Sequence, residues 1–221
     1  MRRLRRRGVT PQSPVGASLR ADRRTLGDTL RARLSVVLSV ALGLLLSACS
    51  GEPTLRGVLV DPPREIPGFT FTLPSGERFE TAADGSRPTV LFFGYTNCPD
   101  VCPTTMVDWK RAKQKLGAHG DSVRYLFVTV DPERDTPAVA DRYAKQFDTA
   151  FLGLSGDAAT TASIMQAFGV SAAREASTDS TRYLVSHSAQ TFLLDASGRL
   201  IAMYTFGMGW DVLAADLEAL R

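Results

Sequence analysis

The sequence predicts an α/β fold in which a central mixed β-sheet is flanked by helices on both faces and preceded by a β-hairpin. Residues 89–94 and 123–130 are continuous apolar runs, which are typical of parallel strands buried on both faces. A helical segment follows each run, and this alternation predicts parallel strands with helices packed on the sheet. Residues 191–195 and 200–205 are two further strands joined by an Ala-Ser-Gly-Arg turn, a hairpin signal that makes the sheet mixed.

Local signals indicate where each element begins and ends. Pro103 lies where a helix can start, and Gly117 lies where the same helix ends. Thr136-Pro137 is an N-cap followed by a proline at the first helical position, and Asp157 is a second cap. In chain order we expect a hairpin at 69–79, a strand at 89–94, a helix at 103–116, a strand at 123–130, a helix at 136–147, a strand at 151–154, a helix at 157–168, a polar loop at 171–186, a strand pair at 191–205 and a helix at 211–220.

The N-terminal segment has the composition of a secretory signal. Residues 1–48 carry ten Arg and only two Asp, and the apolar stretch at 34–46 is too short to cross a bilayer comfortably. The stretch ends in Leu-Ser-Ala-Cys, which resembles a bacterial lipobox in which Cys49 becomes the lipidated first residue. An uncleaved anchor with an incidental Cys is the alternative. We expect a signal peptide with a lipobox at 1–48, a Pro-rich tether at 49–65 and one globular domain at 66–221.

Charge is distributed unevenly between the leader and the rest of the chain. The whole sequence has 26 basic and 23 acidic side chains, a net charge of +3. Outside the leader the balance is 16 basic against 21 acidic side chains, a net charge of −5. Nucleic-acid binding depends on Lys and Arg that neutralise phosphates. We therefore expect no nucleic-acid partner.

The cysteines are the most informative feature of the chain. If Cys49 carries lipid, Cys98 and Cys102 are the remaining pair, and a disulfide closing so short a loop would stabilise little. Both lie just ahead of or at the start of the helix expected from Pro103, where free N–H groups and the helix dipole stabilise thiolates. A thiolate is both a metal ligand and a nucleophile. The pair therefore predicts either a soft-metal site that suits copper, with His187 as a nitrogen donor, or a redox-active disulfide.

Three segments in order resemble the Sco/SenC family of copper-binding proteins. They are GYTNCPDVCPTT at 94–105, VTVDPERDTP at 128–137 and VSHSAQTFLLDASGRL at 185–200, and the resemblance covers about residues 66–220. It implies a thioredoxin-like fold, a role in assembling the copper centre of cytochrome c oxidase, and His187 as the third copper ligand. Thioredoxin-like oxidoreductases usually place a cis-proline in the corresponding loop, whereas this chain has no proline after 137.

Two acidic residues follow the second buried strand at its carboxyl end, where the sites of α/β proteins gather. Asp131 and Asp135 are candidates to orient His187 or to tune the metal without binding it. Capping of the helix that begins at Pro137 is an equal alternative for Asp135.

The other imidazole and the tryptophans are expected to be structural. His119 lies in a polar connection without a partner motif, so we expect it to be solvated. Trp109 and Trp210 lie at helical positions, and we expect them in the core or at an interface rather than at a metal.

These observations lead to one functional hypothesis and two alternatives. We interpret the chain as a metallochaperone, lipid-anchored on the extracytoplasmic face of a bacterial membrane, that binds one copper ion, as Cu(I) or Cu(II), through Cys98, Cys102 and His187. Its expected partners are the copper-containing subunit of cytochrome c oxidase and another copper chaperone or a thiol reductant. A thiol–disulfide reductase with Cys98 and Cys102 as its redox pair is the main alternative, since copper entry needs reduced thiols. A copper or redox sensor would use the same site without transfer.

Overall fold

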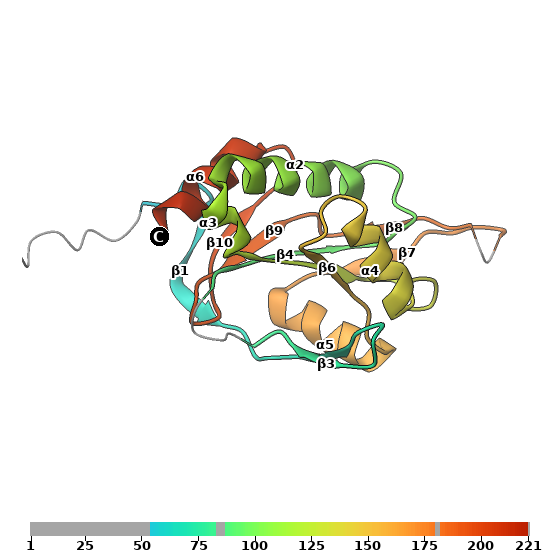
Figure 1. Cartoon of the computed structure of the whole chain (residues 1–221). Coiled ribbons are helices and arrows are strands. Elements are labelled where there is room, and N and C mark those ends of the chain that lie inside the picture. The colour runs from blue at the N-terminus through green and yellow to red at the C-terminus, as the bar shows by residue number, and fades with distance from the viewer. Residues whose placement is uncertain (1–53, 83–86, 180–181, 221) are drawn as a thin grey trace, which may run out of the picture. The chain divides into compact units, whose positions relative to one another are not determined.

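The computed structural model describes residues 54–82, 87–179 and 182–220, and its centre is a six-stranded sheet (Figure 1). The strands lie in the order β1 (Val58–Glu65), β10 (Arg199–Tyr204), β9 (Thr191–Leu194), β4 (Thr89–Gly94), β5 (Arg124–Thr129) and β6 (Phe151–Leu154). Every residue of β4 and β9 is buried, as expected for strands covered on both faces.

The sheet is mixed, as the sequence predicts. β4, β5 and β6 run parallel, so that Leu91 pairs with Leu126 and Leu126 with Leu152. β9 pairs antiparallel with β4, and β10 and β1 continue the sheet antiparallel. Because β4 and β5 are adjacent and parallel, their carboxyl ends lie side by side. The cysteine loop therefore begins next to the turn that contains Asp131 and Asp135.

Helices cover both faces of the sheet. One face carries α2 (Val101–Leu116), α4 (Pro137–Lys145) and α6 (Trp210–Ala219), which share one apolar core with Phe92 and Phe127. The other face carries α5 (Ala158–Phe168) and the hairpin of β2 (Thr70–Thr72) and β3 (Arg78–Glu80). Figure 1 shows α2 and α6 on one side of the sheet and α5 and β3 on the other. The predicted α/β fold with an N-terminal hairpin is confirmed.

The starts of α4 and α5 agree with the predicted caps, whereas α2 starts earlier than predicted. The Thr136 side chain accepts a hydrogen bond from the N–H of Val139 at the start of α4, and Asp157 caps α5 in the same way. Helix α2 begins at Val101, two residues before the predicted start at Pro103. As a result, Cys102 lies inside the first turn of the helix.

The two tryptophans differ in their surroundings. Trp109 is 1% exposed in the core, as predicted, and its Nε1–H donates to Thr191 Oγ1 at 3.2 Å. Trp210 is half-buried and packs against the margin of the same core.

The segment expected to be a tether differs from that expectation in its second half. Residues 58–65 form β1, which pairs with β10 at the edge of the sheet. Just before β1, the backbone N–H groups of Arg56 and Gly57 donate to the carboxylate of Asp216 at 2.8 and 2.9 Å. The domain therefore begins earlier than residue 66.

The expected signal peptide, its lipobox and Cys49 lie outside the described residues. Within the described part of the chain, no helix combines the length and apolarity needed to cross a membrane.

The segment 171–186, expected to be a polar loop, contains most of a two-stranded ribbon. β7 (Ala172–Arg174) and β8 (Val185–His187) pair antiparallel, with Ala172 opposite His187. These strands are only three residues long, and only Val185 among their six residues is fully buried, so they are too short to show the apolar alternation that predicts a strand. The ribbon places His187 on a strand rather than in a loop.

Asp216 ties the N-terminal edge of the sheet to α6, which yields a prediction on stability. The carboxylate is 1% exposed and also accepts a hydrogen bond from the Tyr204 hydroxyl at 2.8 Å. Asp216→Ala should lower the free energy of unfolding by about 2–3 kcal/mol, because it leaves the buried Tyr204 hydroxyl and the part-buried N–H groups of Arg56 and Gly57 without their acceptor.

Unfolding in denaturant and hydrogen exchange of the β1 amides would measure this effect. Asp211→Ala, which removes an exposed carboxylate from the first turn of the same helix, is the matched control and should cost less than about 1 kcal/mol. Equal stability of the two variants would contradict the role assigned to Asp216.

Candidate metal centre

The two cysteines come from the loop after β4 and from the first turn of α2. A turn closed by the N–H of Cys98 on the carbonyl of Tyr95, at 3.2 Å, brings Cys98 back towards the helix. The N–H of Cys102 then donates to Cys98 Sγ at 3.4 Å. Both cysteines are free, and Cys98 is half-buried whereas Cys102 is fully buried. The two sulfurs form no disulfide in the structure, and Cys98 is the more accessible of the two.

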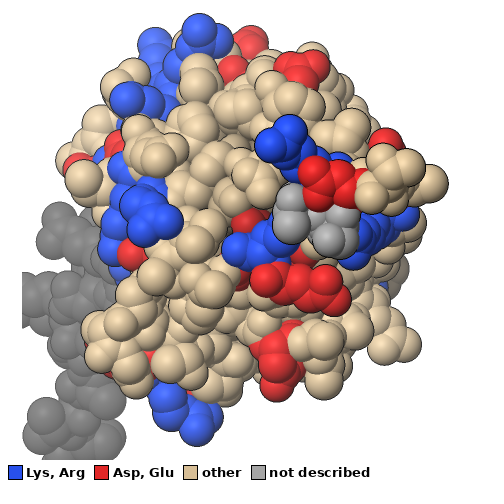
Figure 2. Space-filling view, turned by 90° about the vertical axis from the view of Figure 1, so that its right-hand side faces the viewer, with Lys and Arg blue, Asp and Glu red and all other residues tan. Residues whose placement is uncertain are grey.

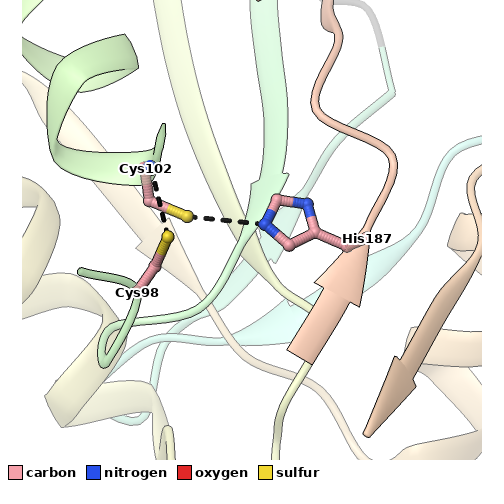
Figure 3. A group of neighbouring side chains, drawn as sticks. All are labelled: Cys98, Cys102 and His187. Carbon is pink, nitrogen blue, oxygen red and sulfur yellow. Dashed lines mark hydrogen bonds between the residues drawn. The ribbon is translucent and has the colours of Figure 1, made fainter. Parts of the chain in front are cut away.

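His187 faces the cysteines from the last position of β8 (Figure 3). Its Nε2 lies 3.6 Å from Cys102 Sγ, and its Nδ1 lies 3.0 Å from the carbonyl oxygen of Ser188. A carbonyl can only accept, so Nδ1 carries the proton and Nε2 presents a lone pair to the sulfur. The ring contacts Phe92 and Tyr95 edge-on at 5.9 and 5.8 Å between centroids, which restricts its orientation.

The three side chains form a compact ligand set. Cys98 Sγ, Cys102 Sγ and one His187 nitrogen all lie within 4.8 Å of one another, and no other group of three potential ligands converges in this way among the described residues. Two thiolates and one imidazole are a donor set for a soft or borderline ion such as copper or zinc. A hollow of about 350 Å³, lined partly by Cys98, His187 and Leu184, gives access to the set.

The entrance lies at one end of the molecule. Figure 2 views the end at which α2 begins and the β7–β8 ribbon projects. Acidic and basic side chains are interspersed on this face around uncharged surface. Asp100 and Glu175 are among the residues that line the hollow, so its margin carries negative charge.

Burial controls the protonation of the ligands. Burial raises the pKa of the Cys102 thiol well above its usual range and outweighs the lowering by the Tyr95 backbone N–H. The expectation that the start of α2 stabilises a thiolate is therefore wrong for Cys102, because desolvation is the larger effect. Burial also lowers the pKa of His187, so the imidazole is neutral near pH 7 and ready to bind. Metal binding must then displace a proton from Cys102.

Asp135 holds the cysteine loop. It is 1% exposed, and its carboxylate accepts from the backbone N–H and hydroxyl of Thr96 at 2.9 and 2.6 Å. The hydroxyl of Thr129 donates to the same carboxylate at 2.6 Å. The cap of α4 is Thr136, so the capping alternative for Asp135 is wrong.

Asp131 holds the ribbon that carries His187. Its carboxylate accepts from the Tyr183 hydroxyl at 2.8 Å and pairs with Arg134, whose Nη1 donates to the Tyr183 carbonyl at 2.9 Å. The guanidinium also stacks on the Tyr183 ring at 3.5 Å. His187 is oriented by the Ser188 carbonyl rather than by either aspartate. Sequence reasoning did not find Tyr183 or Arg134, because nothing local links residues 49 positions apart.

His119 is structural but not solvated, which corrects the expectation for it. The side chain is half-buried on the short helix α3 (Ala118–Asp121), and its Nε2 donates to the carbonyl of Leu217 in α6 at 2.8 Å. Ser122 Oγ lies 3.3 Å from Nδ1. His119 therefore links two helices through a long-range hydrogen bond that its polar sequence context did not indicate.

Comparison with known proteins agrees with this geometry. A SCO2-like protein of Rickettsia felis is 31% identical over 178 residues, which cover 76% of this chain and 87% of the relative. The solution structure of apo Sco1 from Thermus thermophilus is 39% identical, with a TM-score of 0.69, and the match covers 78% of this chain and 100% of that one. The copper-bound structure of Bradyrhizobium japonicum ScoI is 34% identical, with a TM-score of 0.64, and the match covers 71% and 99%. The sequence model of the SCO1/SenC family matches residues 60–221, and the chain belongs to this family.

Proposed function

We propose that the chain is an extracytoplasmic copper-binding metallochaperone that helps to assemble the copper centre of cytochrome c oxidase, by delivering copper or by preparing the acceptor. The observation that carries the proposal is the convergence of Cys98 Sγ, Cys102 Sγ and a His187 nitrogen within 4.8 Å. Copper is the cargo of this activity rather than a resident cofactor.

The donor set favours copper among the soft ions. Two thiolates suit Cu(I), and the imidazole adds the nitrogen that Cu(II) prefers, so one site serves both oxidation states. The copper-bound Bradyrhizobium relative supports this choice of metal. Three protein ligands leave further coordination positions for a group from the acceptor.

The difference in burial indicates an order of ligand exchange. Cys102 is fully buried, whereas Cys98 and His187 line the hollow that opens to the surface. An incoming thiol or imidazole would reach the ion through this hollow and replace Cys98 or His187 first. Cys102 would release the ion last, and its raised pKa favours the recapture of a proton on release.

The same cysteines support the alternative of a thiol–disulfide reductase that acts on the oxidase subunit. Cys98 and Cys102 are both free, and Cys98 is the accessible one, as required of an attacking thiol. His187, rather than a proline, occupies the strand end that faces them. Oxidoreductases of this fold dock their substrate strand beside a cis-proline, so broad disulfide reduction is disfavoured here. A copper or redox sensor would need only the binding step.

The proposal also covers location and partners. The basic leader and the Leu-Ser-Ala-Cys sequence support attachment through lipid on Cys49 at the extracytoplasmic face of a bacterial membrane. The family resemblance supports the copper-containing oxidase subunit as the acceptor. Another copper chaperone or a thiol reductant would supply the ion or keep the two thiols reduced.

Metal titration of single variants tests the ligand set. The reduced protein should bind one copper per chain, and Cys98→Ala or Cys102→Ala should each weaken Cu(I) binding by more than the roughly 10–100-fold cost of losing an outer partner. His187→Ala should lose Cu(II), with its thiolate charge-transfer colour, more severely than Cu(I), because the cuprous ion is satisfied by two thiolates.

Competition with a chelator and absorption spectroscopy would measure both effects. Ser186→Ala changes the exposed neighbour of His187 on β8 and should bind copper like the wild type. Wild-type affinity in either cysteine variant would show that the ligand assignment is wrong. An unchanged spectrum in His187→Ala would remove the histidine from the site.

Turnover on disulfide substrates separates the chaperone from a general reductase. We expect reduction of an unrelated disulfide protein such as insulin to be far slower than reduction by a thioredoxin measured in parallel, because the docking proline is absent. Tight copper binding should be found in the same preparation. Fast insulin reduction together with weak copper binding would make the reductase the primary function.

A further inference from the structure

The chain enters the folded domain at a fixed point. Leu55 packs against the apolar core that the sheet shares with α2 and α6. The N–H groups of the next two residues, Arg56 and Gly57, donate to the buried carboxylate of Asp216 on α6. The chain is therefore held in place from Leu55 onward, three residues before β1 begins at Val58.

The segment between this point and the proposed lipid anchor is short. Cys49 and Leu55 are six residues apart. A chain in any conformation spans at most about 3.3–3.6 Å per residue, so the segment covers roughly 20 Å at most. A compact domain of this size has a radius of gyration of about 15 Å and is roughly 40 Å across. The segment is thus shorter than the domain is wide, and a lipid on Cys49 lets only the side around Leu55 face the bilayer.

That side carries exposed apolar side chains. Among the described residues five large apolar side chains are exposed, and three of them, Val58, Leu59 and Phe206, form what we call the entry patch. Val58 and Leu59 begin β1 and are 49% and 57% exposed. Successive side chains of a strand point to opposite faces, so both are reached together only from the outer edge of β1. Val58 pairs antiparallel with Met203, which brings Phe206, just after β10, alongside the chain that enters β1. Single exposed apolar side chains are ordinary, whereas a group of them indicates an interaction surface.

A bilayer fits the entry patch better than a second copy of the chain. β1 is the outermost strand of the sheet, and an edge strand can pair with another strand. The residues after the patch oppose such pairing, because Pro62 and Pro63 lack the N–H donor that a sheet edge offers. Asp61, Arg64 and Glu65 are charged and exposed, which protects the edge further. A short apolar edge beside a lipid-bearing cysteine instead suits the boundary between headgroups and acyl chains.

We propose that the entry patch rests on the bilayer to which Cys49 is attached, and that this contact holds the metal entrance away from the lipid. The inference rests on the proposed lipid attachment. The cysteine loop follows β4, which β10 and β9 separate from β1, so about 14 Å of sheet lies between them. Figure 1 shows β1 at one side of the domain and the β7–β8 ribbon at the other. The hollow at Cys98 and His187 therefore stays open to a protein domain that projects from the same membrane.

Quenching of an introduced tryptophan by brominated lipid tests the contact in the full lipidated protein. Leu59→Trp places the reporter in the entry patch, and Leu184→Trp places it on the ribbon side at a residue of similar exposure. The protein is reconstituted in vesicles of phosphatidylethanolamine and phosphatidylglycerol with brominated acyl chains. Above the background of Trp109 and Trp210, the Leu59→Trp emission should be quenched several-fold more than that of Leu184→Trp. Equal quenching would show that the domain has no preferred side and would overturn the proposal.

Val58→Asp, made in the Leu59→Trp protein, tests whether apolar side chains hold the contact. A carboxylate leaves water for the acyl region only at a large cost, so quenching should fall to the level of Leu184→Trp. Val107→Asp makes the same change at an exposed valine of α2 and should leave the quenching unchanged. Circular dichroism verifies that both variants fold. Equal quenching in the two variants, or a dimer in detergent that Val58→Asp dissociates, would overturn the proposal, and the dimer would assign the edge to a second copy.

Two further measurements on the same preparation separate this inference from the proposed function. Mass spectrometry establishes whether Cys49 carries lipid, and copper titration establishes whether the metal centre is functional. Lipid on Cys49 without preferential quenching of Leu59→Trp would overturn the inference and leave the copper function intact. Preferential quenching in a protein that does not bind copper would refute the copper function and leave the contact intact. An unmodified Cys49 would refute both the attachment and the contact.

Discussion

The turn that follows β5 determines the distance between the two parts of the metal centre. Asp135 at its end holds the loop before Cys98 through Thr96, and Asp131 at its start holds the ribbon before His187 through Tyr183. The ligand atoms belong to a loop, a helix and a short strand, and the contacts of the His187 ring with Phe92 and Tyr95 add a second link between the ribbon and the cysteine loop. Because β4 and β5 are adjacent and parallel, the turn and the cysteine loop begin side by side, and short side chains can join them.

This arrangement places two carboxylates in the protein interior. They are stable there because both oxygens of each carboxylate have a hydrogen-bond or ion-pair partner. Asp135 accepts three hydrogen bonds, and Asp131 combines an ion pair with Arg134 and a hydrogen bond from Tyr183. A buried charge is tolerated when its hydrogen bonds are satisfied. Loss of one partner destabilises the fold, because the desolvation of the charge is then no longer compensated. The result is a ligand set that is positioned before a metal arrives, with a neutral imidazole and a protonated Cys102. Binding then costs little reorganisation of the chain.

The sequence predicted those parts of the molecule that depend on local patterns. Apolar runs identified β4 and β5, side-chain caps identified the starts of α4 and α5, and the cysteine spacing indicated two members of the candidate ligand set. His187 was a possible nitrogen donor by residue type, and the family resemblance assigned it as the third ligand, because one histidine in a polar segment carries no local signal.

The features that the sequence-based predictions missed share a physical cause. β1 is an edge strand with mostly exposed side chains, and β7 and β8 are a ribbon of two three-residue strands, so tertiary pairing rather than apolar periodicity makes them strands. The hydrogen bond from His119 to Leu217 and the contacts of Arg134 with Tyr183 join distant segments, which spacing alone does not reveal. Cys102 does lie at a helix start, as predicted. Its thiol pKa is nevertheless raised, because burial outweighs the effect of the helix dipole, and this burial depends on the packed core rather than on local sequence.

The central claim is that Cys98, Cys102 and His187 bind one ion together. X-ray absorption of the copper-loaded protein tests it most directly, because the scattering of sulfur and of an imidazole ring can be told apart at the metal. We expect two sulfur ligands and one imidazole at a single copper, with the imidazole signal lost in His187→Ala. A copper bound by sulfur alone in the wild type, or an imidazole signal that survives in His187→Ala, would contradict the account.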